Sequence, residues 1–359
     1  NCYHRGRGVI IVKRKKVAVL FGGCSNEYEV SLQSAYSVIT NLNPDKYEAI
    51  LIGITRQGAW LRYYGALEKI QNNTWMYSDC VPAVISPDRN VHGLIEFYND
   101  KTVTTRIDVA FPIIHGRNGE DGTLQGLLTM AGIPFAGCGT LCSAMCMDKD
   151  IAHKIVNLSG IKTPPSIVLK SEISDFELMK RIKGLKFPLF VKPANAGSSF
   201  GITRVLQKDE LPDAITSAFQ YDNKVIIEEA VNGFEVGCAI LGNNSLVIGE
   251  VDEIELSHGF FDYTEKYTLK TSKIHMPARI DTDTADRIKQ TASIIYRALD
   301  CSGFARVDLF LTPEKEIIFN EVNTIPGFTS HSRYPNMMKG IGMPFEQVIS
   351  CAIELAVRA

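Results

Sequence analysis

One stretch restricts the possible fold of this chain more than any other: residues 305–333, ARVDLFLTPEKEIIFNEVNTIPGFTSHSR. Apolar residues alternate with others over 305–311, a Thr-Pro pair then interrupts the pattern, and an apolar run resumes over 316–322. Two apolar runs separated in this way are typical of two strands joined by a turn. The stretch therefore predicts a β-hairpin. The Pro-Gly pair and Thr-Ser-His-Ser that follow it predict a substrate loop carried on a rigid support.

Polar side chains gather on one face of this predicted hairpin. Because side chains alternate between the two faces of a strand, Arg306 and Asp308 share a face, and so do Glu321 and Asn323 on the second strand. If the strands pair, one surface carries two carboxylates, a carboxamide and a guanidinium. Hard oxygen ligands of this kind suit Mg²⁺, which also bridges to substrate phosphates. The alternative is a solvated face with ordinary surface charges.

Length and composition limit the classes of protein to consider. The chain has 359 residues, enough for two or three domains, and its 45% hydrophobic and 22% charged residues are ordinary for a soluble globular protein. The formal net charge is −2, so we expect no nucleic-acid partner and no anionic membrane partner. No apolar run approaches the ~20 residues of a membrane-spanning helix.

The cysteines favour a reducing compartment. The chain contains nine of them, an odd number at scattered positions, which favours reduced thiols and a cytoplasmic location. Cys138, Cys142 and Cys146 are spaced by four and suggest a metal site. No histidine or carboxylate repeats with them, and the residues between them read as a small-residue helix. Packing thiols are therefore the preferred interpretation.

Residues 1–15 are basic and precede the first predicted strand. Their apolar run, GVII, is too short for the core of a signal peptide. We expect these residues to form a disordered leader, and we assign them no function.

The next segment predicts an α/β layer. Residues 16–21 (KVAVLF) read as a buried strand, Gly22 and Gly23 end it, and a helical period begins near Glu29. This order predicts a doubly wound sheet, in which ligands bind at the carboxyl ends of the strands. A dinucleotide-binding fold is the obvious rival, but it is disfavoured because G-x-G-x-x-G does not follow the strand. Residues 65–106 contain several chain breakers, and we predict them to be irregular.

Two loops of small residues follow predicted strands. The strand at 108–114 enters residues 115–126, of which four are glycine, and a ligand-facing loop is plausible there. The strand at 187–193 enters residues 194–201, ANAGSSFG. Such a loop can bend tightly over phosphates and offer backbone N–H donors, although G-x-x-x-x-G-K-[ST] is absent and a plain hairpin is the alternative. Both loops are candidate ligand-binding segments.

The ordered motif R-x-D…N-E-x-N-T-x-P-G-x-T-x-x-S in the hairpin stretch closely resembles the metal and substrate segment of the D-alanine–D-alanine ligases, which belong to the ATP-grasp superfamily. Five further segments resemble the same family: G-G-x-S-x-E-x-E-V-S-L at 22–32, H-G-x-x-G-E-D-G-x-x-Q-G at 115–126, M-D-K at 147–149, K-P-x-x-x-G-S-S-x-G at 192–201 and D-Y-x-x-K-Y at 262–267.

This resemblance spans nearly all of 16–357 and implies an α/β fold. An N-terminal doubly wound parallel-sheet domain would cover 16–147. A two-domain ATP-grasp would follow, with a central subdomain at 148–231 and a C-terminal subdomain, including an Ω-loop over the site, at 232–359.

The resemblance also implies which residues bind ATP and Mg²⁺. Two Mg²⁺ ions, which Mn²⁺ could replace, would be bound by Asp308, Glu321 and Asn323. Lys149, Lys192 and Lys266 would contact phosphate, residues 228–231 would contact adenine, and Glu235 would contact ribose. The full nucleotide set is Lys149, Lys192, Ser199, Glu228, Glu229, Ala230, Val231, Glu235, Phe260 and Lys266.

The reaction implied is ATP-dependent ligation of two D-amino acids through a D-alanyl phosphate. Glu27 would bind the ammonium of the first D-alanine, with His115 nearby. Ser198 and Tyr267 would form a hydrogen-bonded triad with Glu27 that closes a lid over the site. Lids of this type exclude water while a reactive intermediate exists.

The second subsite decides the product. Arg306 and the backbone N–H of Gly327 would stabilise the tetrahedral oxyanion, and Ser332 would hold the carboxylate of the incoming substrate. D-alanine-specific members of the family usually have leucine at the next position. Here it is Arg333, and a guanidinium beside a hydroxymethyl has a partner that a methyl does not offer.

Together with E-K-Y at 265–267 and the segment DEIELSHGFFDYTEKYTLK, this departure most resembles the VanG-type D-alanine–D-serine ligases of vancomycin resistance. Asp252 and Phe261 would hold the guanidinium of Arg333 by charge and by stacking. The alternative for Arg333 is a surface ion pair, with Asp252 as a candidate partner. Rival functions are a housekeeping D-alanine–D-alanine ligase, another ATP-grasp ligase such as a carboxylase, and a non-catalytic nucleotide-binding module. A homodimer is expected by analogy with the family alone.

Overall fold

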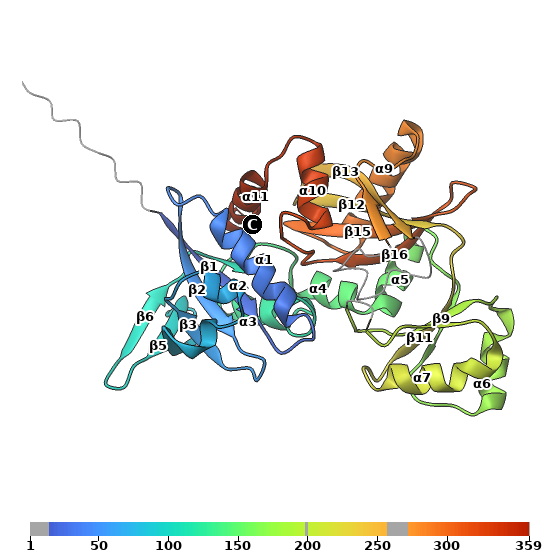
Figure 1. The fold of residues 1–359 in the computed structure, drawn as a ribbon, viewed down its shortest axis with the longest axis horizontal. Helices are drawn as coiled ribbons and strands as arrows, with labels where there is room; N and C mark the ends of the chain where they lie inside the picture. The colour runs from blue at the N-terminus through green and yellow to red at the C-terminus, as the bar shows by residue number, and fades with distance from the viewer. Residues whose placement is uncertain (1–13, 198–199, 257–271, 359) are drawn as a thin grey trace, which may run out of the picture.

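The computed structural model describes residues 14–197, 200–256 and 272–358. Within them the chain forms three β-sheets, of seven, four and five strands, which follow one another along the sequence (Figure 1). Each sheet falls inside one of the three predicted domains. The boundaries between those domains remain predictions.

Three parallel strands form one part of the first sheet, and two of them, β1 and β7, are the strands predicted at 16–21 and 108–114. They pair in the order β2-β1-β7 and comprise β1 (Lys15–Gly22), β2 (Tyr47–Ile54) and β7 (Val109–Pro112). The four residues of β7 and the last six of β1 are buried, as expected for parallel strands covered on both faces. The predicted α/β class is confirmed.

The prediction that residues 65–106 are irregular is wrong. They contain short elements: α2 (Glu68–Gln71), η1 (Trp75–Tyr77), β4 (Cys80–Ile85), β5 (Gly93–Phe97) and β6 (Thr102–Arg106). With β3 (Trp60–Tyr63), these strands extend the sheet beyond β2 as an antiparallel meander. They are short and partly exposed, and β6 buries none of its residues, so their apolar alternation is weak in the sequence.

Helix α1 (Tyr28–Thr40) begins just after the turn that ends β1. Its buried residues include Tyr28, Leu32, Ala35 and Ile39, which recur at helical spacing on one face. The turn places Glu27 at the carboxyl end of the parallel strands. The remaining helices of this part are α3 (Thr123–Ala131) and α4 (Thr140–Met147).

The second sheet is antiparallel, in the order β10-β9-β11-β8, and α5 (Lys149–Leu158) leads into it. Its strands are β8 (Ser166–Leu169), β9 (Leu189–Pro193), β10 (Thr203–Val205) and β11 (Val225–Glu229). Its helices are α6 (Asp175–Arg181), η2 (Ile182–Gly184), η3 (Lys208–Glu210) and α7 (Leu211–Phe219). Helices α6 and α7 pack on the face that carries Val191 and Ile227. The alternating residues Lys192 and Glu228 therefore lie on the opposite face.

The third sheet is also antiparallel, in the order β14-β13-β12-β15-β16. Its strands are β12 (Phe234–Gly242), β13 (Leu246–Leu256), β14 (Ser272–His275), β15 (Phe304–Leu311) and β16 (Ile317–Asn323). Strands β15 and β16 form the hairpin predicted from the alternation. Helix α9 (Thr282–Ala298) packs on one face of the sheet, and α10 (Arg333–Gly340) packs on the other.

The first and third sheets share a hydrophobic core. The C-terminal helix α11 (Phe345–Val357) packs with α1 and β1 at one end and with α10 at the other, and Figure 1 shows it beside α1. Buried aromatic rings continue this core, with Phe111 of β7 and Phe304 of β15 stacked at 5.9 Å between centroids. The second sheet has a core of its own. The N-terminal and C-terminal parts of the chain, which carry the first and third sheets, are thus packed together.

Candidate active site

A cavity of about 520 Å³ lies where the N-terminal sheet, helices α4 and α5, and the β15–β16 hairpin meet. Its walls also include the loop that follows β16. Nine predicted site residues are among those that line it: Glu27, His115, Lys149, Arg306, Glu321, Asn323, Gly327, Ser332 and Arg333. Chain segments hundreds of residues apart thus bring the predicted substrate residues together.

The hairpin face carries the polar cluster that the sequence predicted. The register pairs Arg306 with Asn323 and Asp308 with Glu321. The guanidinium of Arg306 donates to both oxygens of Asp308, at 2.7 and 2.6 Å, and Asn323 Nδ2 donates to the same carboxylate at 2.9 Å. Lys149 Nζ lies 3.4 Å from Glu321 Oε2. This is not a solvated strand face, because Asp308 is only 1% exposed.

The donor set of this face fits a divalent cation. Asp308, Glu321 and Asn323 offer two carboxylates and a carboxamide oxygen, the ligand types that Mg²⁺ prefers. They lie at neighbouring positions of two paired strands and line or adjoin the cavity. Arg306 and Lys149 supply positive charge at the border of the same cluster, where a phosphate group would also be stabilised.

A row of residues across the sheet holds Arg333. Strand register places Asp252 of β13, Gly237 of β12 and Asp308 of β15 side by side. The Arg333 guanidinium donates to both oxygens of Asp252 at 2.8 Å and to Glu235 Oε1 at 2.8 Å, and its Nη1 is 3.5 Å from Asp308 Oδ1. Because Gly237 has no side chain, the guanidinium can lie over the strand between these carboxylates.

The alternative of a surface ion pair for Arg333 is therefore wrong in one respect. The pair with Asp252 is present, but Arg333 is 8% exposed and Asp252 is fully buried. Burial lowers the pKa of Arg333, and the neighbouring Asp252 and Asp308 carboxylates outweigh it, so the pKa is raised. The guanidinium is a fixed positive charge in the wall of the cavity.

No role was predicted for Gly237 from the sequence, yet its missing side chain is a structural requirement. A Cβ there would be 2.4 Å from Arg333 Nη2 and 2.7 Å from Asp252 Oδ1. We expect Gly237→Ala to displace the guanidinium, raise KM for the second substrate and lower the free energy of unfolding by about 1–3 kcal/mol, the usual range for overpacking. Steady-state kinetics and thermal denaturation measure the two effects. Gly184→Ala, where nothing lies within 4 Å of the added methyl, is the control and should leave both unchanged.

Glu27 lies where the first and second sheets approach each other. It is 8% exposed and lines the cavity. A Cβ added to Gly116 would be 2.5 Å from Glu27 Oε2, and one added to Gly197 would be 2.7 Å from it. These two glycines belong to the two ligand-facing loops that the sequence predicted. Both loops therefore pack against the carboxylate of Glu27.

The site contains a second carboxylate, Glu120, that the sequence analysis left without a role. Its Oε2 accepts from the Gly116 N–H at 2.7 Å and its Oε1 from the Ile325 N–H at 3.1 Å. Burial raises its pKa to about 8, with further contributions from Glu27 and Glu321. The signal was present in the sequence, because Glu120 belongs to the quoted motif at 115–126.

The pKa of Glu120 predicts a pH dependence of stability. The folded protein keeps this proton up to about pH 8, whereas the unfolded chain loses it near the ordinary value of 4.5. The free energy of unfolding should therefore fall as pH rises between these values and level off above pH 8. We expect Glu120→Gln to remove that slope. The free energy of unfolding of the variant, relative to that of the wild type, should therefore increase as the pH rises. Urea denaturation over this range, with the exposed Glu314→Gln as control, measures it. Parallel curves for Glu120→Gln and wild type would contradict the assignment.

His115 lines the cavity but is fully engaged by its neighbours. Its Nδ1 donates to the Ile325 carbonyl at 2.9 Å, and its Nε2 accepts from the Ser34 hydroxyl at 3.0 Å. Ser34 in turn accepts from the Phe328 N–H. Burial lowers the pKa of His115 to about 4, so the ring is neutral at pH 7. It joins α1 to the loop after β16 and shapes the substrate cavity without supplying charge.

The predicted nucleotide residues lie on and beside the second sheet. Lys192 Nζ donates to Glu228 Oε1 at 2.5 Å on the face opposite to α6 and α7. Within the described part of the chain, Glu228 Oε2 is buried without a hydrogen-bond partner. A buried carboxylate oxygen of this kind can accept an amino group such as that of adenine. The lysine beside it can contact phosphate, so these residues fit a nucleotide.

The other described residues of the predicted nucleotide site offer weaker support for nucleotide binding, because their contacts are with the protein itself. The Glu229 carboxylate accepts from the Lys186 N–H, and the Ala230 N–H donates to the Pro188 carbonyl. Val231 begins the connection to the third sheet, and Glu235 pairs with Arg333. The remaining predictions lie outside the described residues: Ser198, Ser199, Phe260, Phe261, Lys266 and Tyr267.

The loop after β16 forms the side of the cavity that is predicted to bind the second substrate. Ser332 is the N-cap residue of α10, and its Oγ accepts from the Thr329 N–H at 3.1 Å. A Cβ on Gly327 would lie 2.9 Å from the same oxygen. Because a helix N-terminus favours negative charge, Ser332 is well placed for a carboxylate. The chain order then puts Arg333 directly beside that position.

A buried lysine on one antiparallel sheet and a cluster of carboxylates on the next, with a parallel-sheet domain closing the cavity, are the arrangement of an ATP-grasp ligase. The chain belongs to the D-alanine–D-alanine ligase family. Residues 16–138 match the family described as D-ala D-ala ligase N-terminus, and residues 155–354 match D-ala D-ala ligase C-terminus. It is an ADP-forming ligase that joins D-alanine to a second substrate, and the family implies ATP and Mg²⁺.

Three relatives illustrate the range of this family. The crystal structure of the VanG D-Ala:D-Ser ligase from Enterococcus faecalis is 58% identical, covers 96% of this chain and 100% of its own, and superposes with a TM-score of 0.89. A D-alanine–D-alanine ligase of Caldicellulosiruptor bescii is 44% identical over 95% of both chains. The vancomycin/teicoplanin A-type resistance protein VanA of Enterococcus faecium is 44% identical over 97% of this chain and 100% of its own.

Among the described residues no single helix has the length and apolar composition needed to span a membrane. Helices α10 and α11 have this length and composition only when they are taken together, and the pair is bent by 100° at its junction.

Proposed function

We propose that this ligase joins D-alanine to D-serine through a D-alanyl phosphate and so makes an altered terminus for peptidoglycan precursors. The observation that carries the proposal is the position of Arg333. It lines the cavity next to Ser332 and is fixed by Asp252 and Glu235. D-serine offers a hydroxyl where D-alanine offers a methyl, and a fixed donor in that place favours the substrate that can accept its hydrogen bond.

The hydrogen bonds of Arg333 leave room for this role. A guanidinium has five N–H donors in a rigid fork. Three are used by the bonds to Asp252 and Glu235. One of the others is on Nη1, which also lies 3.5 Å from Asp308 Oδ1, and one is on Nη2. The carboxylates thus orient the fork, and the remaining Nη2 donor can serve the substrate.

The 58% identity to the VanG D-Ala:D-Ser ligase supports the same choice, since it is well above the 44% identity to the D-alanine–D-alanine ligase of Caldicellulosiruptor bescii. The alternative product is D-alanyl-D-alanine. It is favoured if Arg333 serves only to neutralise the buried carboxylates around Gly237, which its three bonds to Asp252 and Glu235 would also explain.

The residues of the cavity would divide the chemistry among them. Glu27 would accept the ammonium group of the first D-alanine, and Arg306, fixed by Asp308, would stabilise its carboxyl oxygen as negative charge develops. The Gly327 N–H would stabilise the same oxyanion in the second step. Mg²⁺ bound by Asp308, Glu321 and Asn323 would neutralise charge on the transferred phosphoryl group.

The lysines would act on ATP from both sides of the cavity. Lys149 lies 3.4 Å from Glu321 Oε2 and lines the cavity, so it can reach a phosphate bound near the metal-binding residues. Lys192 is paired with Glu228 and can contact phosphate while the glutamate accepts the adenine amino group. Preorganised charges of this kind lower the barrier to phosphoryl transfer because they need no rearrangement.

The test is a competition between the two substrates. The enzyme is supplied with ATP, Mg²⁺ and equimolar D-alanine and D-serine, and the dipeptides are quantified by mass spectrometry. We expect D-alanyl-D-serine to exceed D-alanyl-D-alanine by about tenfold or more, as one unsatisfied polar group at the subsite implies. Predominance of D-alanyl-D-alanine would overturn the proposal and leave the housekeeping reaction.

Three further properties belong to this proposal. Two Mg²⁺ ions, replaceable by Mn²⁺, are supported by a donor set that adjoins the phosphate-side lysines. A cytoplasmic location is supported by the reduced thiols and the need for ATP. A homodimer rests on analogy with the family. Metal titration of the kinetics and sedimentation equilibrium measure the first and third.

A further inference from the structure

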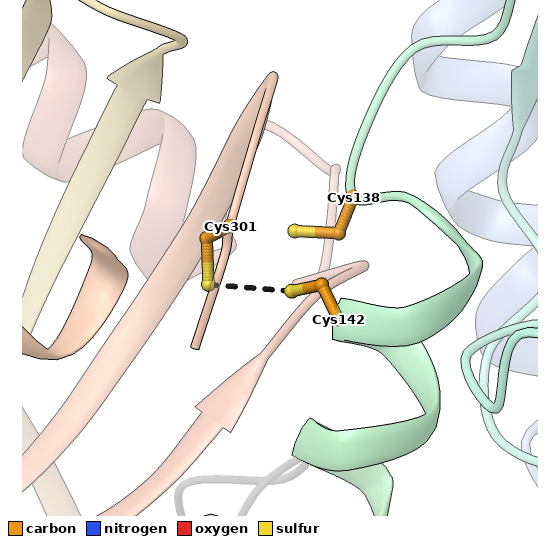
Figure 2. Close-up of side chains that lie close together, drawn as sticks. All are labelled: Cys138, Cys142 and Cys301. Carbon is orange, nitrogen blue, oxygen red and sulfur yellow. Dashed lines mark hydrogen bonds between the residues drawn. The ribbon is translucent and has the colours of Figure 1, made fainter. Parts of the chain in front are cut away.

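Four buried thiols meet between α4 and the third sheet. Cys138 precedes α4, Cys142 and Cys146 lie one turn apart on it, and Cys301 lies between α9 and β15. Their exposed fractions are 3%, 1%, 4% and 9%. Figure 2 shows the sulfurs of Cys138, Cys142 and Cys301 directed toward one another from opposite sides of the interface. The sequence identified the first three and could not identify the fourth, which is 159 residues from Cys142.

The separations of the sulfur atoms are those of ligands around one ion. Cys142 Sγ lies 3.5 Å from Cys301 Sγ and 3.8 Å from Cys146 Sγ. The sulfurs of Cys138, Cys142 and Cys301 lie within 4.8 Å of one another, and Cys146 adjoins this group through Cys142. Tetrahedral zinc with Zn–S bonds of about 2.3 Å requires sulfur separations of about 3.8 Å. A disulfide requires about 2.05 Å, so the geometry fits a shared metal better than a covalent bond.

The surroundings of the cluster are largely apolar, as in a structural metal site. The four cysteines belong to the same buried hydrophobic core as Val156, Ile240, Ile295 and Leu299, and Cys146 also borders the substrate cavity. Cys142 lies in the first turn of α4, where the N–H groups favour a thiolate. The Cys138 thiol donates to the Ser302 carbonyl at 3.4 Å, and a bound metal would displace that proton.

Packing alone explains these thiols less well. An isolated buried cysteine behaves as a small hydrophobic residue and contacts carbon atoms in any direction. Here separate segments of the chain direct the sulfurs of Cys138, Cys142 and Cys301 toward one another, and Cys146 lies beside Cys142. Soft thiolate ligands select metals such as zinc and disfavour the Mg²⁺ of the cavity.

We propose that Cys138, Cys142, Cys146 and Cys301 bind one Zn²⁺ in a tetrathiolate site that ties α4 to the third sheet. Cys146 and Met147 line the substrate cavity, and Lys149 begins the next helix. The metal would therefore fix the wall that carries Lys149 against the hairpin that carries Glu321. The proposal is independent of the choice between D-serine and D-alanine.

The test is metal analysis of the full chain purified under reducing conditions without chelator. We expect about one zinc per chain, and we expect cobalt substitution to give the thiolate-to-cobalt charge-transfer absorption and intense red d–d bands of a tetrahedral thiolate site. Carboxylate binding at Asp308 and Glu321 would give no thiolate charge transfer, so the two sites are distinguished. Removal of the zinc should lower the thermal midpoint by several degrees.

Cys301→Ser and Cys142→Ser are expected to lose most of the zinc and the cobalt spectrum. Cys238→Ser is the matched control, since it removes a fully buried thiol of the same core that is not one of the four. Circular dichroism shows whether each variant is folded. Absence of zinc after reconstitution of the folded wild type, unchanged zinc content in folded Cys301→Ser, or a Cys142–Cys301 disulfide in the native protein would overturn the proposal.

Discussion

Asp308→Asn is expected to lower kcat by roughly a thousandfold, because the metal loses a charged ligand at the phosphoryl-transfer step. A factor of this size corresponds to about 4 kcal/mol of transition-state stabilisation. Asparagine has nearly the same shape and keeps one oxygen that can accept from Arg306. The fold should therefore survive, although Arg306 and Arg333 lose part of their neutralising charge.

Kinetics as a function of Mg²⁺ concentration, together with thermal denaturation, measure this variant. Glu321→Gln, on the paired strand, should behave alike. Glu316→Gln is the control, because Glu316 is on the same hairpin but is exposed and pairs with Lys162. Wild-type turnover at ordinary Mg²⁺ would remove Asp308 from the metal site. A rise in KM for D-alanine alone, with an unchanged Mg²⁺ dependence, would assign Asp308 to holding Arg306.

Arg333→Leu is expected to shift the product from D-alanyl-D-serine toward D-alanyl-D-alanine, by roughly ten- to a hundredfold in the ratio of kcat/KM values. The range follows from the cost of about 1–3 kcal/mol for one unsatisfied polar group. The change should appear chiefly in KM for the second substrate, because Arg333 adjoins Ser332. The KM for the first D-alanine should change little, since Glu27 and Arg306 remain.

The buried partners of Arg333 complicate this substitution. Asp252 is fully buried, and loss of its counter-ion leaves an uncompensated charge that costs several kcal/mol of stability. The double variant Arg333→Leu/Asp252→Asn removes that charge together with the guanidinium and keeps the test valid if the single variant does not fold. Arg287→Leu, at an exposed position of α9, is the control. A retained D-serine preference in either folded variant would show that serine is recognised elsewhere.

The hairpin and its polar face could be predicted because their information is local. The alternation of side chains within each strand decides that Arg306 shares a face with Asp308, whatever the rest of the chain does. The same holds for the helical period of α1. Local alternation was too weak to predict β4, β5 and β6, because these strands are short and β6, at the edge of the sheet, buries none of its residues.

The partners of Arg333 could be proposed but not established from the sequence. Asp252 is 81 residues away from Arg333 and Glu235 is 98 residues away. Their contact depends on the register of three strands and on the absence of a side chain at Gly237. The spacing of these residues in the sequence therefore does not show whether the ion pair is exposed or buried. It is buried because α10 packs on the sheet.

By itself the sequence determined the α/β class of the N-terminal part, the acids and carboxamide of one strand face, and the motifs that identify the ligase family. Tertiary structure decided which charges neutralise one another, raised the pKa of Glu120, and brought Cys301 to the thiols of α4. The physical reason is that periodicity fixes the direction of a side chain relative to its own backbone. Burial, charge pairing and ligand geometry depend on which distant surfaces that side chain meets.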